Sequence, residues 1–327
     1  MGNAIAFLCL PGLDSFSKTV IRGLQQHYPG EFNIIECVSS DGSAFQQAIA
    51  QADVVWIEWA NELAIELTRN PQILQRRKVI VRCHAYEIVD GYIERVNWDP
   101  VSKVIFVSNG IAGYAAERVP KLASRTTIIP NGIDLEKFRN DRGDRRAPGK
   151  NIGLLALLNH KKGLQLLLHA FHHLVSKYKG YKLHLGGPWT DESERLYFEH
   201  MAQKMGISEN IIQYGNVDNA AEWWQKMDFA VCTSPRESHG VGLCEAMACG
   251  VKPVIHWFPW AETIYPEKYL WLTVEQFAQH IRAESAFNPA EYRSYVADHF
   301  DLTKTSRSVR ALLLGELMNT PSREIRS

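Results

Sequence analysis

The sequence lacks several features that would assign its class directly. Its 327 residues include 36 basic and 36 acidic residues, so the chain has no net charge and no basic field that would attract nucleic acid. No apolar run approaches the roughly 20 uncharged residues that span a bilayer. The six cysteines form no C-x-x-C pair, which favours reduced core residues over disulfides or a metal site. We therefore expect a cytoplasmic protein that binds no nucleic acid.

Common nucleotide and metal motifs are also absent. No G-x-G-x-x-G follows the first predicted strand and no G-x-x-x-x-G-K-[ST] occurs, which argues against a dehydrogenase and a P-loop enzyme. The sequence has no D-x-D and no H-E-x-x-H. We therefore expect no metal held by paired carboxylates and no cofactor other than the substrates.

What the sequence does contain is a regular alternation of two kinds of segment. Short β-branched runs of strand length alternate with longer segments of helical period, as in a parallel sheet covered by helices. The predicted strands are 4–10, 32–38, 54–57, 79–83, 104–107, 127–129, 152–158, 182–185, 211–214, 229–232 and 253–256. The predicted fold class is therefore α/β, with ligands at the carboxyl ends of the strands.

A polar segment without period separates two halves of this alternation. It covers residues 140–150 (NDRGDRRAPGK), and the strands resume directly after it. The chain is also more than twice the roughly 150 residues usual for one domain. We predict two Rossmann-like domains, 1–147 and 148–300. A segment 301–327 follows, and its predicted helix covers residues 310–318.

One glycine-containing turn carries most of the chemistry. It follows the strand 229–232 and enters a helix at about Leu243. Backbone N–H groups at the positive end of a helix favour a diphosphate. The groups expected there are those of Gly240, Val241, Gly242 and Leu243.

Two carboxylates bracket this turn, Glu237 and Glu245, with seven residues between them. A carboxylate repels a diphosphate, so each is expected to serve hydroxyl groups or a developing cation. The alternative is that Glu245 only stabilises the positive end of its own helix. The spacing by itself leaves both interpretations open.

Five stretches of the sequence, in order, resemble the motifs of the retaining family 4 glycosyltransferases (glycosyl transferases group 1). They are the strand 104–108 with Pro130-Asn-Gly-Ile-Asp134, Lys162-Gly163 before a helix, His184-Leu-Gly-Gly187, Tyr214-Gly215, and Asp228–Glu245 with its E-x7-E signature. The resemblance implies a GT-B fold: two Rossmann-like domains facing a central cleft, with the last helix crossing back to the N-terminal domain. It also implies metal-independent transfer of a sugar from a nucleotide diphosphate donor with retention of configuration.

The resemblance also implies roles for residues of the C-terminal domain. Glu237 would hold the hydroxyls of the donor sugar, Glu245 those of the ribose, and Lys162 the diphosphate. The family has an arginine where this chain has Leu157, and Lys161 or His160 could replace it. His239 stands where the family has phenylalanine, which leaves its part in donor binding open. The aromatic residues Trp257, Phe258 and Trp260 are either core or contacts for a sugar.

On the N-terminal side the resemblance points to the acceptor. His84 ends the fourth predicted strand and matches a histidine that the family places near the acceptor. Gly12 follows the first strand, where the family has glycines near the donor phosphates, although a plain turn explains it equally well. Glu58 and Trp59 are better explained as a polar strand end than as acceptor contacts.

The sequence thus predicts a glycosyltransferase with a UDP- or GDP-linked donor and a carbohydrate or lipid-linked acceptor. Its products would belong to cell-surface polysaccharide, lipopolysaccharide or glycolipid. The basic cluster 76–78 is either a solvated face or a contact with the inner face of the membrane. Two alternatives stay open: a GT-B nucleotide-sugar epimerase, and a non-catalytic nucleotide-sugar-binding protein.

Overall fold

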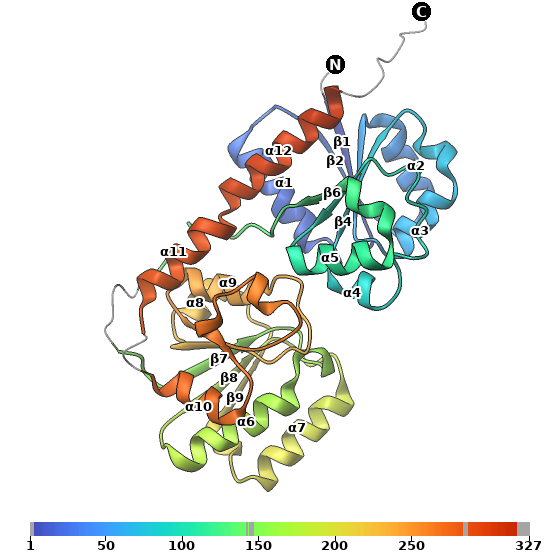
Figure 1. Cartoon of the computed structure of the whole chain (residues 1–327). Coiled ribbons are helices and arrows are strands. Elements are labelled where there is room, and N and C mark those ends of the chain that lie inside the picture. Colours follow the sequence, from blue (N-terminus) through green and yellow to red (C-terminus); the bar gives the residue numbers. More distant parts are fainter. Residues whose placement is uncertain (1–2, 142, 144–146, 284–286, 319–327) are drawn as a thin grey trace, which may run out of the picture. The chain divides into compact units, whose positions relative to one another are not determined.

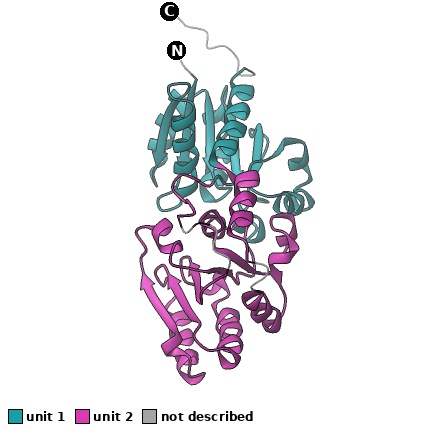
Figure 2. Cartoon of the chain, turned by 90° about the vertical axis from the view of Figure 1, so that its left-hand side faces the viewer, with its two compact units in different colours: residues 1–132, 302–327 teal, residues 133–301 magenta. Residues whose placement is uncertain are grey.

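The computed structural model of the chain describes residues 3–141, 143, 147–283 and 287–318 (Figure 1). The chain divides into two compact units (Figure 2). Unit 1 consists of residues 1–132 and 302–327, and unit 2 of residues 133–301. Each unit is built on one six-stranded parallel sheet, which confirms the predicted α/β class.

Unit 1 has a doubly wound sheet with the strand order β2-β1-β3-β4-β5-β6. Its strands are β1 (Ala4–Cys9), β2 (Asn33–Val38), β3 (Val54–Glu58), β4 (Lys78–Cys83), β5 (Lys103–Phe106) and β6 (Thr126–Ile128). Its helices are α1 (Ser15–His27), α2 (Gly42–Gln51), α3 (Glu62–Arg69), α4 (Ala85–Val89), α5 (Asn109–Arg118) and α12 (Leu302–Met318). The winding direction reverses between β1 and β3, which makes the carboxyl ends of these strands the expected ligand position.

The last helix, α12, packs on unit 1 next to α1, although the whole of unit 2 lies between the two helices in the sequence (Figure 1). Val309 and Leu313 of α12 are fully buried in the core of unit 1. The two helices approach closely at Gly23, where an added Cβ would lie 2.3 Å from Oγ of Ser306. The predicted return of the last helix to the N-terminal unit is confirmed. The helix begins at Leu302, earlier than the predicted start at Arg310, and residues 319–327 of the predicted segment lie outside the described residues.

Unit 2 repeats the doubly wound plan with the strand order β12-β11-β10-β7-β8-β9. Its strands are β7 (Asn151–Leu155), β8 (Lys182–Gly186), β9 (Ile211–Gly215), β10 (Phe229–Cys232), β11 (Lys252–His256) and β12 (Leu270–Trp271). Its helices are α6 (Leu164–Lys177), α7 (Glu192–Lys204), α8 (Ala220–Trp224), α9 (Val241–Ala248), α10 (Val274–Arg282) and α11 (Pro289–Phe300). The winding direction reverses between β7 and β10. Of the strands in the described residues, the two-residue strand β12 alone was not predicted.

Unit 2 begins at Ile133, before the polar segment 140–150. The backbone N–H of Ile133 donates to the carbonyl of Phe300 at 2.6 Å. Arg293 of α11 donates to the carbonyls of Phe138 at 2.7 Å and Leu135 at 3.0 Å. These bonds attach the residues that precede the polar segment to unit 2.

All six cysteines are free thiols, and five of them are buried core residues as predicted. The prediction is wrong for Cys37, which is only partly buried. Among the described residues, no helix combines the length and the apolar character needed to cross a membrane.

Candidate functional site

The point where the sheet of unit 2 reverses its winding brings together two loops that are far apart in the sequence. The loop after β7 supplies Lys162 and the loop after β10 supplies Glu237. Their side chains form an ion pair, with 2.6 Å between Nζ of Lys162 and Oε1 of Glu237. The hydroxyl of Ser234 donates to the same oxygen at 2.8 Å. Two residues of the predicted donor site are therefore in direct contact.

The two loops can meet because one of them carries a glycine. Gly163 has a left-handed backbone conformation, with φ +60°, and its α-carbon faces the carbonyl of Thr233. A Cβ at this position would lie 2.0 Å from that carbonyl oxygen. The hydroxyl of Thr233 in turn donates to the carbonyl of Lys162 at 2.9 Å. Any larger residue at 163 would separate the loops and move Lys162 away from Glu237.

The ion pair is accessible to solvent. The side chain of Lys162 is 27% exposed and that of Glu237 is 17% exposed. Burial alone would lower the pKa of Lys162, but the charge of Glu237 and the hydrogen bond with it outweigh burial and raise that pKa above its ordinary value. The site therefore presents a fully charged ammonium to an incoming anion.

The helix α9 begins beside this pair, at Val241 instead of the predicted position near Leu243. Gly240 precedes it with φ +68°, and an added Cβ would lie 2.9 Å from the hydroxyl of Tyr265. The N–H of Leu243 bonds to the carbonyl of Gly240 at 3.0 Å, so the prediction that this N–H is available to a ligand is wrong. Within the described residues, the N–H groups of Gly240, Val241 and Gly242 have no recorded acceptor.

The other predicted donor contacts flank the first turn of α9. Glu245 lies one turn into this helix and is partly exposed. The side chain of His239 is buried and packs edge-on against Phe300, with 4.3 Å between the ring centroids. Its carbonyl accepts a hydrogen bond of 2.5 Å from the hydroxyl of Tyr265. The backbone of His239 is therefore close to the turn, whereas its ring belongs to the core of unit 2.

The loop after β7 contains the position of the missing arginine. Leu157 is 57% exposed there. His160 and Lys161 follow in a short 3₁₀ helix, His160–Lys162. Nδ1 of His160 lies 3.2 Å from a carboxylate oxygen of Asp191, whereas the side chain of Lys161 is exposed. The charge of Asp191 makes His160 the weaker of the two candidates for binding a phosphate.

In unit 1, His84 lies directly after β4, at the carboxyl edge where it was predicted. The side chain is 1% exposed, and its ring packs against Trp59 and Phe16 with centroid distances of 4.1 and 4.6 Å. Nε2 lies 3.1 Å from Oε1 of Glu58. Burial lowers the pKa of His84, so the ring is neutral at pH 7. In this structure the imidazole is held inside unit 1.

Glu58 has more partners than a polar strand end would need. Its side chain is fully buried, and Oε1 lies 3.5 Å from a guanidinium nitrogen of Arg82, the residue paired with it across the β3–β4 ladder. The indole N–H of Trp56 donates to Oε2 at 2.9 Å. Burial would raise the pKa of Glu58, but the charge of Arg82 and the hydrogen bond with His84 hold it below its ordinary value. The sequence did contain a sign of this cluster, because Glu58, Arg82 and His84 are three titratable residues at the ends of adjacent strands.

Two residues of unit 1 adopt left-handed backbone conformations near this cluster. Trp59 has φ +75°, which is uncommon for a residue with a side chain, and its indole N–H donates to the carbonyl of Leu13 at 2.8 Å. Gly12 has φ +80° in the turn after β1, and an added Cβ would meet no atom within 4 Å. Its conformation alone accounts for a glycine at this turn.

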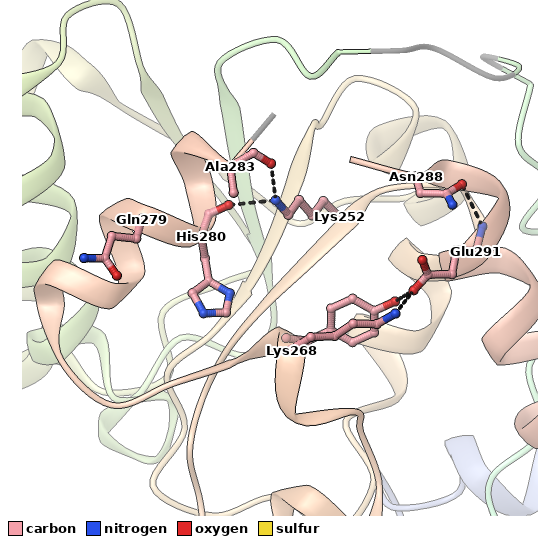
Figure 3. A pocket seen from close by; sticks show the side chains of 8 residues that line it. Lys252, Lys268, Gln279, His280, Ala283, Asn288 and Glu291 are labelled. Atoms are coloured by element: carbon pink, nitrogen blue, oxygen red, sulfur yellow. Dashed lines mark hydrogen bonds and ion pairs between the residues drawn. The ribbon is translucent and has the colours of Figure 1, made fainter. Parts of the chain in front are cut away.

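A separate pocket lies at the opposite edge of the unit 2 sheet, where β11 begins (Figure 3). Its volume is about 400 Å³. Lys252, the first residue of β11, is 3% exposed, and its ammonium donates to the carbonyls of His280 at 2.8 Å and Ala283 at 3.0 Å. Burial lowers the pKa of Lys252 to about 8. These carbonyls end helix α10, so Lys252 stabilises a helix terminus.

The described residues contain no group of three or more His, Cys, Asp or Glu side chains arranged to hold a metal ion. The charges of Lys162 and Glu237 converge at the carboxyl edge of unit 2.

One family model matches the part of unit 2 that contains this site. Residues 140–265 match the family model described as glycosyl transferases group 1. The chain is 29% identical over 148 residues to D-inositol 3-phosphate glycosyltransferase 2 from Catenulispora acidiphila, an alignment that covers 40% of this chain and 34% of the relative. It is 26% identical over 133 residues to the lipopolysaccharide core biosynthesis mannosyltransferase LpcC from Rhizobium leguminosarum bv. viciae, covering 37% of each chain. The chain thus spans about a third of the length of these two curated relatives.

The similarity to solved structures extends over both units. The crystal structure of HepE from Anabaena in complex with UDP-glucose matches with a TM-score of 0.79 and 15% identity, covering 95% of this chain and 99% of HepE. Sucrose-phosphate synthase from Thermosynechococcus elongatus matches with a TM-score of 0.78 and 14% identity, covering 97% of this chain and all of that chain (100%). At this identity the similarity concerns the fold. The chain has the GT-B fold, and residues 140–265 of unit 2 are similar to the glycosyl transferases group 1 family.

Proposed function

We propose that this protein transfers a sugar from a nucleotide diphosphate sugar to an acceptor hydroxyl, with retention of configuration and without a metal ion. The contact between Lys162 and Glu237 at the carboxyl edge of unit 2 is the observation that carries the proposal. It puts a cation for the diphosphate and a carboxylate for the sugar hydroxyls within one hydrogen bond of each other. The activities named for the relatives, a glycosyltransferase and a mannosyltransferase, support the same reaction class.

The leaving diphosphate would be stabilised by two groups of this chain. The ammonium of Lys162 is a point charge that can bind phosphate oxygens. The N–H groups of Gly240, Val241 and Gly242 start helix α9 and add the positive end of its dipole. Together they provide the electrostatic stabilisation for which other transferases use a metal ion.

The acceptor would bind on unit 1, with His84 at its site. The neutral imidazole could orient an acceptor hydroxyl once its bond to Glu58 is exchanged. A UDP- or GDP-linked donor and a carbohydrate or lipid-linked acceptor follow from the same proposal, as does peripheral contact of the enzyme with a membrane that carries such an acceptor. UDP-glucose is the first donor to test, because HepE was crystallised with it.

The decisive experiment uses the full chain with UDP-glucose, UDP-galactose and GDP-mannose, with and without EDTA. We expect one donor to release its nucleoside diphosphate in EDTA, and NMR to show a product sugar with the anomeric configuration of the donor. An epimerised nucleotide sugar formed without acceptor would indicate the epimerase instead. Binding of all donors without any product would indicate a non-catalytic binding protein.

A further inference from the structure

Glu237 holds its two carboxylate oxygens in different environments. Oε1 accepts hydrogen bonds from both Nζ of Lys162, at 2.6 Å, and Oγ of Ser234, at 2.8 Å. Among the described residues, the structure gives no partner to Oε2. The carboxylate is therefore fixed through one oxygen, and the other remains for a ligand.

Of the two partners of Oε1 of Glu237, Ser234 is held more firmly than Lys162. Its side chain is 2% exposed, and it lies two residues after the end of β10, the strand that pairs with β7 at the centre of the sheet. The side chain of Lys162, in contrast, is 27% exposed and flexible along its four-carbon stem. Ser234 is therefore the rigid hydrogen-bond partner of Oε1, and Lys162 is the mobile one.

The difference matters when a donor binds, and this step rests on the function proposed above. A diphosphate in the site attracts the ammonium of Lys162, which weakens its hold on Glu237. The terminal torsion of a glutamate is broad and has no strongly preferred angle, so a carboxylate held by one partner fewer can rotate. The hydroxyl of Ser234 is neutral and buried, so a diphosphate attracts it less strongly than it attracts the ammonium of Lys162.

We propose that Ser234 is a positioning residue, which keeps Oε1 of Glu237 fixed so that Oε2 faces the hydroxyls of the donor sugar. Ser234 itself touches no reacting atom in this arrangement. It acts on the sugar through the carboxylate, and its removal should affect the sugar-dependent part of donor binding and the turnover, but not the binding of the nucleoside diphosphate.

The test compares Ser234→Ala with the unaltered protein by calorimetry with UDP and UDP-glucose, or with GDP and GDP-mannose if that donor supports transfer. Removing one hydrogen bond to a charged group is expected to reduce a rate or an affinity by about tenfold. We expect turnover to fall about tenfold and affinity for the nucleotide sugar to fall about fivefold. Affinity for the nucleoside diphosphate should stay within about twofold, because Ser234 does not contact it.

The matched control is Ser306→Ala in unit 1, which removes an equally buried hydroxyl that donates to its own helix at Leu302. In a Glu237→Ala background, Ser234→Ala should have no further effect on the ratio of the two affinities, since nothing remains to be positioned. An unchanged ratio in the single variant overturns the positioning role. A complete lack of transfer and of nucleotide binding by the unaltered protein overturns the proposed function first.

Discussion

Unit 1 and unit 2 both place charged side chains at the carboxyl edge of a parallel sheet, but water reaches the two clusters to different extents. In unit 1 the side chains of Glu58, Arg82 and His84 are at most 2% exposed. In unit 2 those of Lys162 and Glu237 are 27% and 17% exposed. One cluster has its charges enclosed with their partners, and the other keeps them within reach of solvent.

The same sheet topology thus carries one cluster of charges that must stay paired and another that can exchange its partners. A buried charge must keep its partner, because removing one member leaves the other desolvated without compensation. A partly exposed pair can exchange its partner for a ligand at lower cost, since solvent screens both charges in part. We therefore expect substitutions in the unit 1 cluster to affect folding first, and those in the unit 2 cluster to affect turnover first.

The largest effect is expected for Glu58→Gln, which removes the negative charge beside the buried guanidinium of Arg82. The variant should lose about 3–5 kcal/mol of unfolding free energy, the usual cost of breaking a buried ion pair. Urea unfolding followed by tryptophan fluorescence measures it. As a control, Glu222→Gln removes an exposed partner of Lys226 and should change stability by less than about 1 kcal/mol. A stable Glu58→Gln protein would remove the contrast between the units.

Glu237→Ala should have the opposite effect, a large loss of turnover with little loss of stability. We expect kcat to fall at least about 100-fold, or about 2.7 kcal/mol, because in the proposed function the carboxylate would interact with the sugar most strongly in the transition state. Unfolding free energy should change by less than about 1 kcal/mol. Glu245→Ala should instead raise the donor KM, since the ribose contacts proposed for Glu245 would persist through the reaction. Near-normal turnover of Glu237→Ala would show that the accessible pair has no catalytic part.

Lys252 is a second kind of buried charge, because among the described residues its ammonium donates to backbone carbonyls and not to a carboxylate. Its pKa is about 8 in the folded protein and 10.5 in an ordinary lysine, so the unfolded chain binds more protons between these values. Stability should therefore rise by about 2 kcal/mol from pH 8 to pH 10 through this group. Lys252→Met should abolish that part of the rise, measured as the difference between the two proteins' unfolding curves. Parallel pH profiles would contradict it.

The smallest effect is expected on nucleotide binding by His84→Ala. Affinity for a nucleoside diphosphate should stay within about threefold, or 0.6 kcal/mol, while transfer is lost if His84 serves the acceptor. Its bond to Glu58 supports the opposite interpretation, a histidine that holds unit 1 together. That alternative predicts a lower melting temperature with normal transfer by the molecules that remain folded. The outcome decides whether the enclosed cluster takes part in the reaction.

Local patterns in the sequence predicted most strands because buried parallel strands are continuous β-branched runs. The strand β12 was missed because Leu270–Trp271 is too short to show a period. The start of α9 was misplaced because Gly240 ends the turn in a left-handed conformation, which leaves Val241 to begin the helix.

The candidate site was predictable only in part. The E-x7-E spacing and the family resemblance indicated Glu237 and Lys162 as donor-site residues, but their direct contact was not predicted. The participation of Ser234 depends on side-chain rotamers, which no sequence pattern encodes. The enclosure of Glu58 with Arg82 depends on the register of β3 against β4 and on the burial of both side chains, and a single sequence shows neither.

The covalent path of the chain has one more consequence. Unit 1 is interrupted after Gly132 and resumes at Leu302, and an added Cβ at Gly132 would lie 2.8 Å from the α-carbon of Leu302. The two ends of unit 2 also meet, through the hydrogen bond from Ile133 to Phe300. Unit 2 is thus an insertion whose boundaries coincide in space, and excising residues 133–301 would leave two closely spaced ends in each piece. A short linker could rejoin unit 1, and loop-closure entropy would oppose that rearrangement only slightly.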